Sequence, residues 1–305
     1  MAAAAASLLT SNMRKHAAFV AFILISSLGF YTTLAALVQY SLHDRSSSHI
    51  ILIPFVSFFL LYVERQRVFS ISTTSIAPGI GVAIAGLILH LLAVRGPIPA
   101  EGNWSLFAQA IAVILVWVAG FLFFYGIAAI RAGAFALLFL LLMVPMPDVI
   151  LNWTINALQE GSTDIAYLIF KLVGTPVLRH GFVLALPTVT IEVAQECSSI
   201  RSSMALFITC LLAAHLYLRT GWKKLVLVLL SLPLSLIKNG IRIATLTLLS
   251  IYVDPRFLTG SLHSEGGFVF FFLALFMLLP VFLWMERSDN PRRHASAPVS
   301  ARAIN

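Results

Sequence analysis

Residues 105–124 have the sequence SLFAQAIAVILVWVAGFLFF, a run without a charged side chain. A helix needs roughly 20 apolar residues to cross the hydrocarbon core of a bilayer. Hydrophobic residues make up 60% of the 305-residue chain and charged residues only 10%, a balance that a soluble fold cannot bury in one core. We therefore expect an all-α integral membrane protein, a bundle of about eight transmembrane helices. They are predicted near residues 16–41, 48–63, 76–94, 105–124, 130–146, 198–218, 223–252 and 267–285.

The distribution of Lys and Arg predicts how this bundle is oriented. Basic residues in short loops tend to stay on the cytoplasmic side of the membrane. With both termini cytoplasmic, that side receives Arg14, Lys15, Arg65, Arg67, Arg131, Arg219, Lys223, Lys224, Arg287, Arg292, Arg293 and Arg302. The outer loops keep only Arg45, Arg95, Lys171, Arg179 and Arg256. The net charge of +8 then reflects topology and attraction to anionic membrane lipid, and no nucleic-acid partner is expected.

The chain is predicted to form one polytopic membrane domain over residues 1–286, followed by a disordered basic cytoplasmic tail over residues 287–305. Residues 147–196 are expected outside. Apolar residues at helical spacing in 149–173 indicate interfacial helices at the outer face. Residues 188–193 alternate polar and apolar side chains, which predicts a short β-hairpin just before Cys197.

Cys197 stands at the outer start of the predicted 198–218 helix, where free backbone N–H groups and the helix dipole favour an anion such as a thiolate. Arg201, one turn later, adds positive charge. Cys210 lies thirteen residues further on, roughly 20 Å by helical rise, so the two cannot form a disulfide within one helix. Cys197 is therefore a candidate nucleophile; the alternative is a small buried apolar residue.

Arg242 lies inside the predicted 223–252 span, with Lys238 and Asn239 one turn earlier. A guanidinium at that depth costs several kcal/mol and needs a compensating anion or a polar cavity. We interpret Arg242 as functional, the alternatives being an ion pair with an acidic residue of a neighbouring helix or a water pocket shared with Lys238.

His263 lies in the outer loop before the last span, on the same predicted membrane face as Cys197 and Arg242. A thiol, a guanidinium and an imidazole together suit acyl transfer through a thioester. Arg242 would stabilise the oxyanion, and His263 would protonate the leaving amine. Water as acceptor makes a protease, and an amine makes a transpeptidase.

Three sequence blocks resemble those of the exosortases and archaeosortases. Cys197-Ser198-Ser199-Ile200-Arg201 resembles the family's Cys-Ser-Gly-x-Arg block, Asn239-Gly240-Ile241-Arg242-Ile243 its Asn-x-x-Arg-Ile block, and His263-Ser264-Glu265-Gly266-Gly267 its histidine block. Weaker similarities are Ser48-His49 with Pro54, and Pro145-Met146-Pro147-Asp148. Ser199 departs from the family's usual glycine, which bears on substrate preference.

The resemblance implies a catalytic trio of Cys197, Arg242 and His263, without metal or cofactor. Arg201, Asn239, Ser198 and Glu265 are implied as substrate-binding or supporting residues. It also implies a bacterial inner-membrane enzyme whose active site faces the periplasm. Its substrates would be exported proteins with a C-terminal sorting signal of the PEP-CTERM kind: a Pro-Glu-Pro-like motif, a transmembrane helix and a basic cluster. Such systems accompany exopolysaccharide and biofilm-matrix export.

Other functions fit parts of the sequence. A transporter also carries charges inside its spans, although no repeated halves are visible here. A metalloenzyme would use His43, His49, His180 and His263, whose spacing matches no compact ligand pattern. A noncatalytic assembly factor of a polysaccharide export system would tolerate loss of the Cys197 thiol.

Overall fold

The structure is a computed structural model that describes residues 2–70, 73–99, 101–194, 200–258 and 267–289. Cys197, Ser198, His263 and Glu265 lie outside the described residues. The chain divides into two compact units, Met1–Leu151 and Asn152–Asn305, and each is described by itself.

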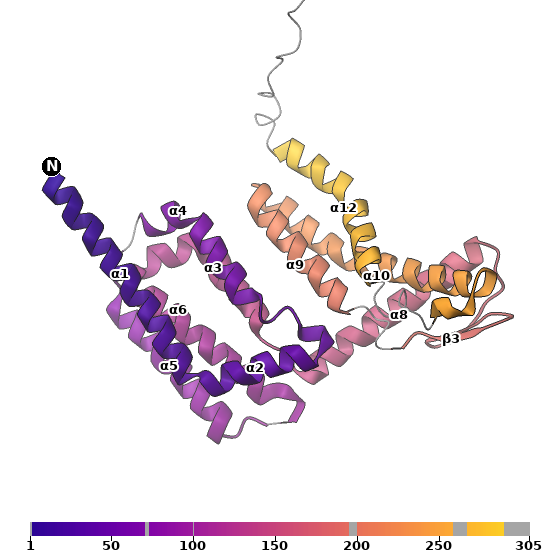
Figure 1. Ribbon diagram of the computed structural model, residues 1–305, viewed down its shortest axis with the longest axis horizontal. Coiled ribbons are helices and arrows are strands. Elements are labelled where there is room, and N and C mark those ends of the chain that lie inside the picture. Colours follow the sequence, from indigo (N-terminus) through magenta and orange to yellow (C-terminus); the bar gives the residue numbers. More distant parts are fainter. Residues whose placement is uncertain (1, 71–72, 100, 195–199, 259–266, 290–305) are drawn as a thin grey trace, which may run out of the picture. The chain divides into compact units, whose positions relative to one another are not determined.

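Helices make up the described part of the first unit (Figure 1). Its α-helices are α1 (Ala2–Gly29), α2 (Tyr31–His43), α3 (Ile53–Val63), α4 (Arg65–Phe69), α5 (Ile76–Arg95), α6 (Trp104–Ala132) and α7 (Ala134–Phe139). Short 3-10 turns are η1 (Arg45–Ser47), η2 (Glu101–Asn103) and η3 (Leu140–Met143).

The first predicted span is bent, because residues Met13–Gly29 of α1 meet α2 at an angle of 77°. Two serines before the bend turn their hydroxyls back on the helix: Ser26 and Ser27 both donate to the carbonyl of Ile23, at 3.0 and 2.6 Å. Such back-bonding, followed here by Gly29, is a recognised cause of helix bending.

Helices α5 and α6 pack closely because glycines remove side chains from their contact. A Cβ on Gly79 would lie 2.9 Å from the Cβ of Phe123, and one on Gly86 would lie 3.0 Å from a methyl of Val116. Helix α6 is interrupted at Gly126, whose φ of 79° suits glycine and whose added Cβ would lie 1.8 Å from the carbonyl oxygen of Thr73.

The second unit contains α8 (Asp148–Leu172, whose first turn belongs to the first unit), α9 (Ile200–Tyr217), α10 (Gly221–Tyr252) and α12 (Gly267–Asp289) (Figure 1). A 3-10 turn, η5 (Pro255–Leu258), follows α10. Three strands precede α9: β1 (Leu178–His180), β2 (Val183–Ala185) and β3 (Thr190–Glu192).

The predicted hairpin is confirmed and gains a strand. Strand β2 pairs antiparallel with both β1 and β3, with His180 opposite Val183 and Ala185 opposite Thr190. Gly181 in the first turn has a φ of 60°. The sheet belongs to a core with α8 and α10, composed of Ala166, Phe170, Leu184, Leu186, Val193, Ile243 and Ala244.

The membrane character of the fold is confirmed. Among the described residues, five helices are long and apolar enough to cross a membrane: Ile76–Arg95, Glu101–Ala132, Ile200–Tyr217, Gly221–Tyr252 and Gly267–Asp289. Two bent pairs raise the number to seven if each is one span: Met13–Gly29 with Tyr31–His43, and Ala134–Met143 with Asp148–Leu172. Ile53–Val63 is a shorter apolar helix, at the remaining predicted position.

Helices α9, α10 and α12 share an apolar core that contains the free thiol of Cys210, which is fully buried.

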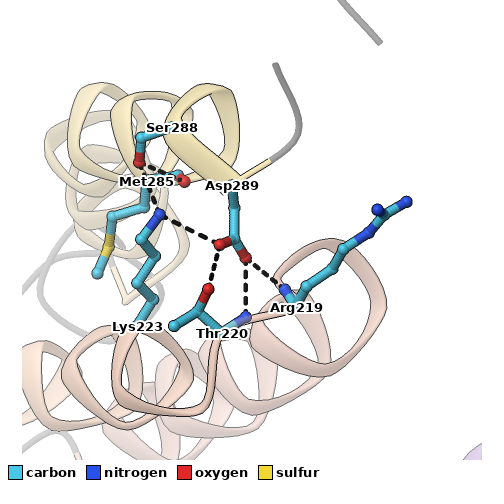
Figure 2. Close-up of polar contacts among 6 residues, drawn as sticks. All are labelled: Arg219, Thr220, Lys223, Met285, Ser288 and Asp289. Carbon is cyan, nitrogen blue, oxygen red and sulfur yellow. Dashed lines mark hydrogen bonds and ion pairs between the residues drawn. The ribbon is translucent and has the colours of Figure 1, made fainter. Parts of the chain in front are cut away.

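At one end of this core, Asp289 ties α12 to the connection between α9 and α10 (Figure 2). Its carboxylate accepts hydrogen bonds from the backbone N–H of Arg219 (2.5 Å), the backbone N–H of Thr220 (2.9 Å) and the Thr220 hydroxyl. Lys223 lies 3.2 Å from the same carboxylate and donates to the Ser288 hydroxyl at 2.8 Å. An anion is thus supplied to the N-terminus of α10, where the helix dipole favours it.

Candidate active site

Three of the predicted site residues are described: Arg201 on the first turn of α9, and Asn239 and Arg242 on α10. Arg201 is exposed, Asn239 is buried and Arg242 is half-buried. The structure brings Asn239 and Arg242 into a polar cluster that includes further residues not singled out as site residues by the sequence.

Helices α9 and α10 form an antiparallel hairpin joined by the short connection after Tyr217. Lys238 of α10 contacts α9 near its beginning. Its ammonium nitrogen donates to the hydroxyl of Ser202, two residues after α9 begins. Lys238 is only 1% exposed. The contact fixes the middle of α10 against the first turn of α9.

Arg242 lies one turn beyond Lys238 on the same face of α10, because residues four apart share a helix face. Four residues advance a helix by about 6 Å, and Ser202 lies about 3 Å from the start of α9. Along the hairpin axis, Arg242 therefore lies toward the beginning of α9. Helix α10 continues past this level to Tyr252.

Helix α8 contacts α10 at Asn239, the residue after Lys238. The side-chain amide of Asn239 donates to the hydroxyl of Ser162 at 2.9 Å, and both residues are buried. Gly240 makes the close approach possible, because a Cβ there would lie 2.4 Å from a methyl of Ile165. A buried hydrogen bond beside such a contact fixes both the rotation and the height of the two helices.

Helix α8 also holds the strand that leads toward the predicted nucleophile. The amide nitrogen of Gln159 donates to the backbone carbonyl of Val193, and the N–H of Val193 donates to the carbonyl of Phe182 at 2.9 Å. Gln159 is 4% exposed. The described backbone is therefore fixed on both sides of residues 195–199, by Gln159 before them and by Ser202 after them.

The cluster is rich in positive charge. Between Ile200 and Tyr252 the sequence contains no Asp or Glu, whereas Lys238 and Arg242 lie in the interior of α10. The N-terminus of α9 adds the positive end of its dipole. Chemically, such a place stabilises negative charge that develops on an oxygen or a sulfur.

The sequence indicated Lys238 and Asn239 by their depth in a span, but not their partners. The partners Gln159, Ser162 and Ser202 are polar residues on amphipathic or membrane helices. Only their hydrogen bonds in the folded structure distinguish them from other polar residues of these helices. A buried polar residue in an otherwise apolar helix is the signal that could have identified Gln159 and Ser162.

A second polar cluster lies in the first unit, near the weaker family similarity at Ser48-His49. The carboxylate of Asp44 accepts hydrogen bonds from the backbone N–H and the hydroxyl of Ser46, at 2.9 and 2.6 Å, and from the hydroxyl of Ser47 at 3.1 Å. Burial raises the pKa of Asp44, but these hydrogen bonds outweigh burial and hold the pKa below its ordinary value. This cluster fixes the turn that connects α2 to α3.

Comparison with known families decides the classification. A family model described as transmembrane exosortase (Exosortase_EpsH) matches residues 41–280. The chain belongs to the transmembrane exosortase family. The matched range contains the polar cluster of this exosortase-family protein together with Cys197 and His263. Neither a curated protein nor a solved structure matches the chain.

Membership of the exosortase family carries general consequences. It implies a multi-pass membrane protein and, in general terms, a cysteine-type membrane peptidase or transpeptidase. Exosortases act on exported proteins that carry sorting signals.

Proposed function

We propose that this protein is a bacterial inner-membrane cysteine transpeptidase that cleaves C-terminal sorting signals of exported proteins at the periplasmic face. The observation that carries the proposal is the level of Arg242. Half-buried Arg242 lies one turn beyond Lys238, which bonds the first turn of α9, and Cys197 precedes that helix by three residues in the sequence.

In the first half of the reaction, the Cys197 thiolate attacks a peptide carbonyl beside the sorting motif. The new C–S bond creates an oxyanion, and Arg242 stabilises it with a planar pair of N–H donors. The peptide C–N bond then breaks, and His263 gives the leaving amine its proton. The product is a thioester between the exported protein and Cys197.

In the second half, an incoming nucleophile attacks the thioester and His263 takes its proton. An amine gives a conjugated product, and water gives a free acid. Asn239 positions Arg242 because its hydrogen bond to Ser162 holds α10 against α8 at that height. Arg201, Ser198 and Glu265 are proposed as supporting residues around the substrate.

The proposed substrate signal has a Pro-Glu-Pro-like motif, a transmembrane helix and a basic cluster, and the proposed setting is exopolysaccharide or biofilm-matrix export. A substrate helix can associate with the bundle within the lipid, so that its motif meets the membrane surface. We propose that both termini are cytoplasmic, because that orientation places most of the Lys and Arg residues of the loops on the cytoplasmic side.

The test is co-expression of a reporter bearing such a signal with wild-type protein or with Cys197→Ala. We expect Cys197→Ala to abolish cleavage while the protein still inserts into the membrane. Cys210→Ala is the matched control, because Cys210 is fully buried in the apolar core, and it should cleave normally. Mass spectrometry of the new C-terminus separates a free acid from a conjugate. Undiminished cleavage by Cys197→Ala would reject the mechanism.

A further inference from the structure

Strand β3 forms one edge of the three-stranded sheet, because β2 lies between β1 and β3. The side chains of Thr190 and Glu192 are exposed, and Ile191 between them packs against the core that the sheet shares with α8 and α10. Among the described residues, β3 pairs with no strand other than β2. An edge strand directs backbone N–H and C=O groups outward, where they can pair with another chain.

The hydrogen bonds at the two ends of the β2–β3 ladder determine which backbone groups of β3 face outward. At one end the N–H of Val193 donates to the carbonyl of Phe182, and at the other the N–H of Leu186 donates to the carbonyl of Val189, both at 2.9 Å. Opposite residues in an antiparallel ladder alternate between hydrogen-bonded and non-hydrogen-bonded pairs. The pair next to each of these bonds is therefore not hydrogen-bonded.

Thr190 and Glu192 belong to these two pairs, opposite Ala185 and Val183 of β2. Their backbone N–H and C=O groups therefore point away from β2. The carbonyl of Glu192 already accepts a hydrogen bond from the N–H of Ala194 at 3.0 Å. Among the described residues, the edge thus offers two N–H donors, those of Thr190 and Glu192, but a single unoccupied carbonyl, that of Thr190.

The opposite edge of the sheet, β1, offers less. By the same alternation, only Arg179 of its three residues directs its N–H and C=O away from β2. The side chain of Arg179 also ties this edge to the molecule, because it pairs with Asp164 of α8 and donates to the carbonyl of Gly181 at 3.0 Å. Strand β3 is therefore the edge that can accept a further strand.

The excess of donors on β3 indicates what kind of segment pairs with it. In an antiparallel strand added there, the residue opposite Glu192 accepts the Glu192 N–H, while its own N–H would find the Glu192 carbonyl occupied. Proline has no N–H, so it gives up no hydrogen bond at this position. The residues before and after that proline direct their side chains to the other face of the sheet, so an acidic neighbour does not meet the Glu192 carboxylate.

We propose that β3 binds the exported protein by strand addition: an extended, proline-containing segment pairs antiparallel with β3 and places a proline opposite Glu192. This inference rests on the proposed function and specifies how its substrate is held. Main-chain hydrogen bonds of this kind supply affinity for an extended peptide. The preference for proline follows from the hydrogen bond between Ala194 and Glu192.

The test is disulfide crosslinking between Thr190→Cys and the reporter, in full-length protein that also carries Cys197→Ala and Cys210→Ala. This background contains no other thiol and should leave the reporter uncleaved. Reporters carry one cysteine each, at successive positions on and around the motif. Residues opposite each other at an antiparallel edge have Cα atoms about 5.5 Å apart, within the range of a disulfide. Leu178→Cys is the matched control, because Leu178 lies in the same row of the sheet, opposite Ala185, but on the other edge.

Thr190→Cys should crosslink with the reporter residue two places after a motif proline, at least about tenfold more than with the residue on either side of it. Leu178→Cys should crosslink with none of these positions. Equal crosslinking of neighbouring positions, no crosslink from Thr190→Cys, or crosslinks from Leu178→Cys instead would overturn strand addition at β3.

A second measurement removes one donor. Glu192→Pro deletes the outward N–H but spares the bonds between β2 and β3, so KM for the reporter should rise roughly threefold to tenfold with little change in kcat. A change confined to kcat would also contradict the proposal. Cleavage of the reporter by protein with Cys197 intact tests the proposed function separately: if it is cleaved and the crosslinks fail, the proposed function stands and strand addition does not.

Discussion

The two halves of α10 each bury a lysine that donates to a serine hydroxyl, and their surroundings differ. Lys223 donates to Ser288 and has the carboxylate of Asp289 at 3.2 Å (Figure 2). Lys238 donates to Ser202 and has Arg242 one turn away. The first lysine has a compensating anion and joins helix ends. The second adds a positive charge beside Arg242 in the interior of the helix, and charged groups at such a depth are typical of functional sites.

Glycines show the same contrast. A Cβ on Gly221, at the start of α10, would meet nothing within 4 Å, whereas one on Gly240 would collide with Ile165 of α8. Close packing and two interior cations, Lys238 and Arg242, therefore coincide in the second half of the helix, where Asn239 also bonds Ser162. We infer that this half holds the reactive groups and that the first half holds the bundle together.

The largest expected effect is that of Arg242→Lys. A point charge cannot reproduce the planar donor pair of a guanidinium, so we expect cleavage of the reporter to fall by about a hundredfold or more. Arg219→Lys is the control from the other end of the hairpin, where Arg219 contacts Asp289 through its backbone N–H, and its cleavage rate should be normal. Near-normal turnover by Arg242→Lys would show that the guanidinium has a structural role. The two halves of α10 would then not differ in function.

A smaller effect is expected from Gly240→Ala. The added methyl would lie 2.7 Å from the Cβ of Ile165 and 3.2 Å from the backbone nitrogen of Ala166, so the two helices must separate. Overpacking of this kind costs about 1–3 kcal/mol of unfolding free energy. Thermal or denaturant unfolding in micelles would measure it, together with a lower cleavage rate.

The matched substitution is Gly221→Ala, at an open position of the same helix, and we expect it to leave stability unchanged or raise it by up to about 1 kcal/mol. Equal effects of the two substitutions would mean that α8 and α10 do not depend on their close approach.

Much of the fold could be predicted from hydrophobic run length and alternation. Residues 105–124 and 223–252 fall within α6 and α10, and the alternation at 188–193 marks the sheet. The bend before α2 was not predicted, because an apolar run does not register the backbone hydrogen bonds that Ser26 and Ser27 form. Strand β1 was missed because its Arg179 and His180 do not follow an apolar alternation.

Part of the candidate site could be predicted from the sequence. The depth of Lys238, Asn239 and Arg242 in one span could be deduced from the sequence, since charge in lipid is costly. Their partners could not, because Ser162 and Ser202 belong to other helices and become neighbours through packing at Gly240 and in the α9–α10 hairpin. The positions of Cys197 and His263 remain predictions.

Whether the Cys197 thiol and Arg242 share one pocket is tested most directly by crosslinking. The variant Arg242→Cys is treated with a short bismaleimide, whose length is similar to that of the arginine side chain it replaces. The reagent should join position 242 to the native Cys197, and peptide mass spectrometry would detect the crosslink. Lys223→Cys, nineteen residues earlier on the same helix, should give no crosslink to Cys197. A crosslink from position 223, or none from position 242, would contradict the proposed active site.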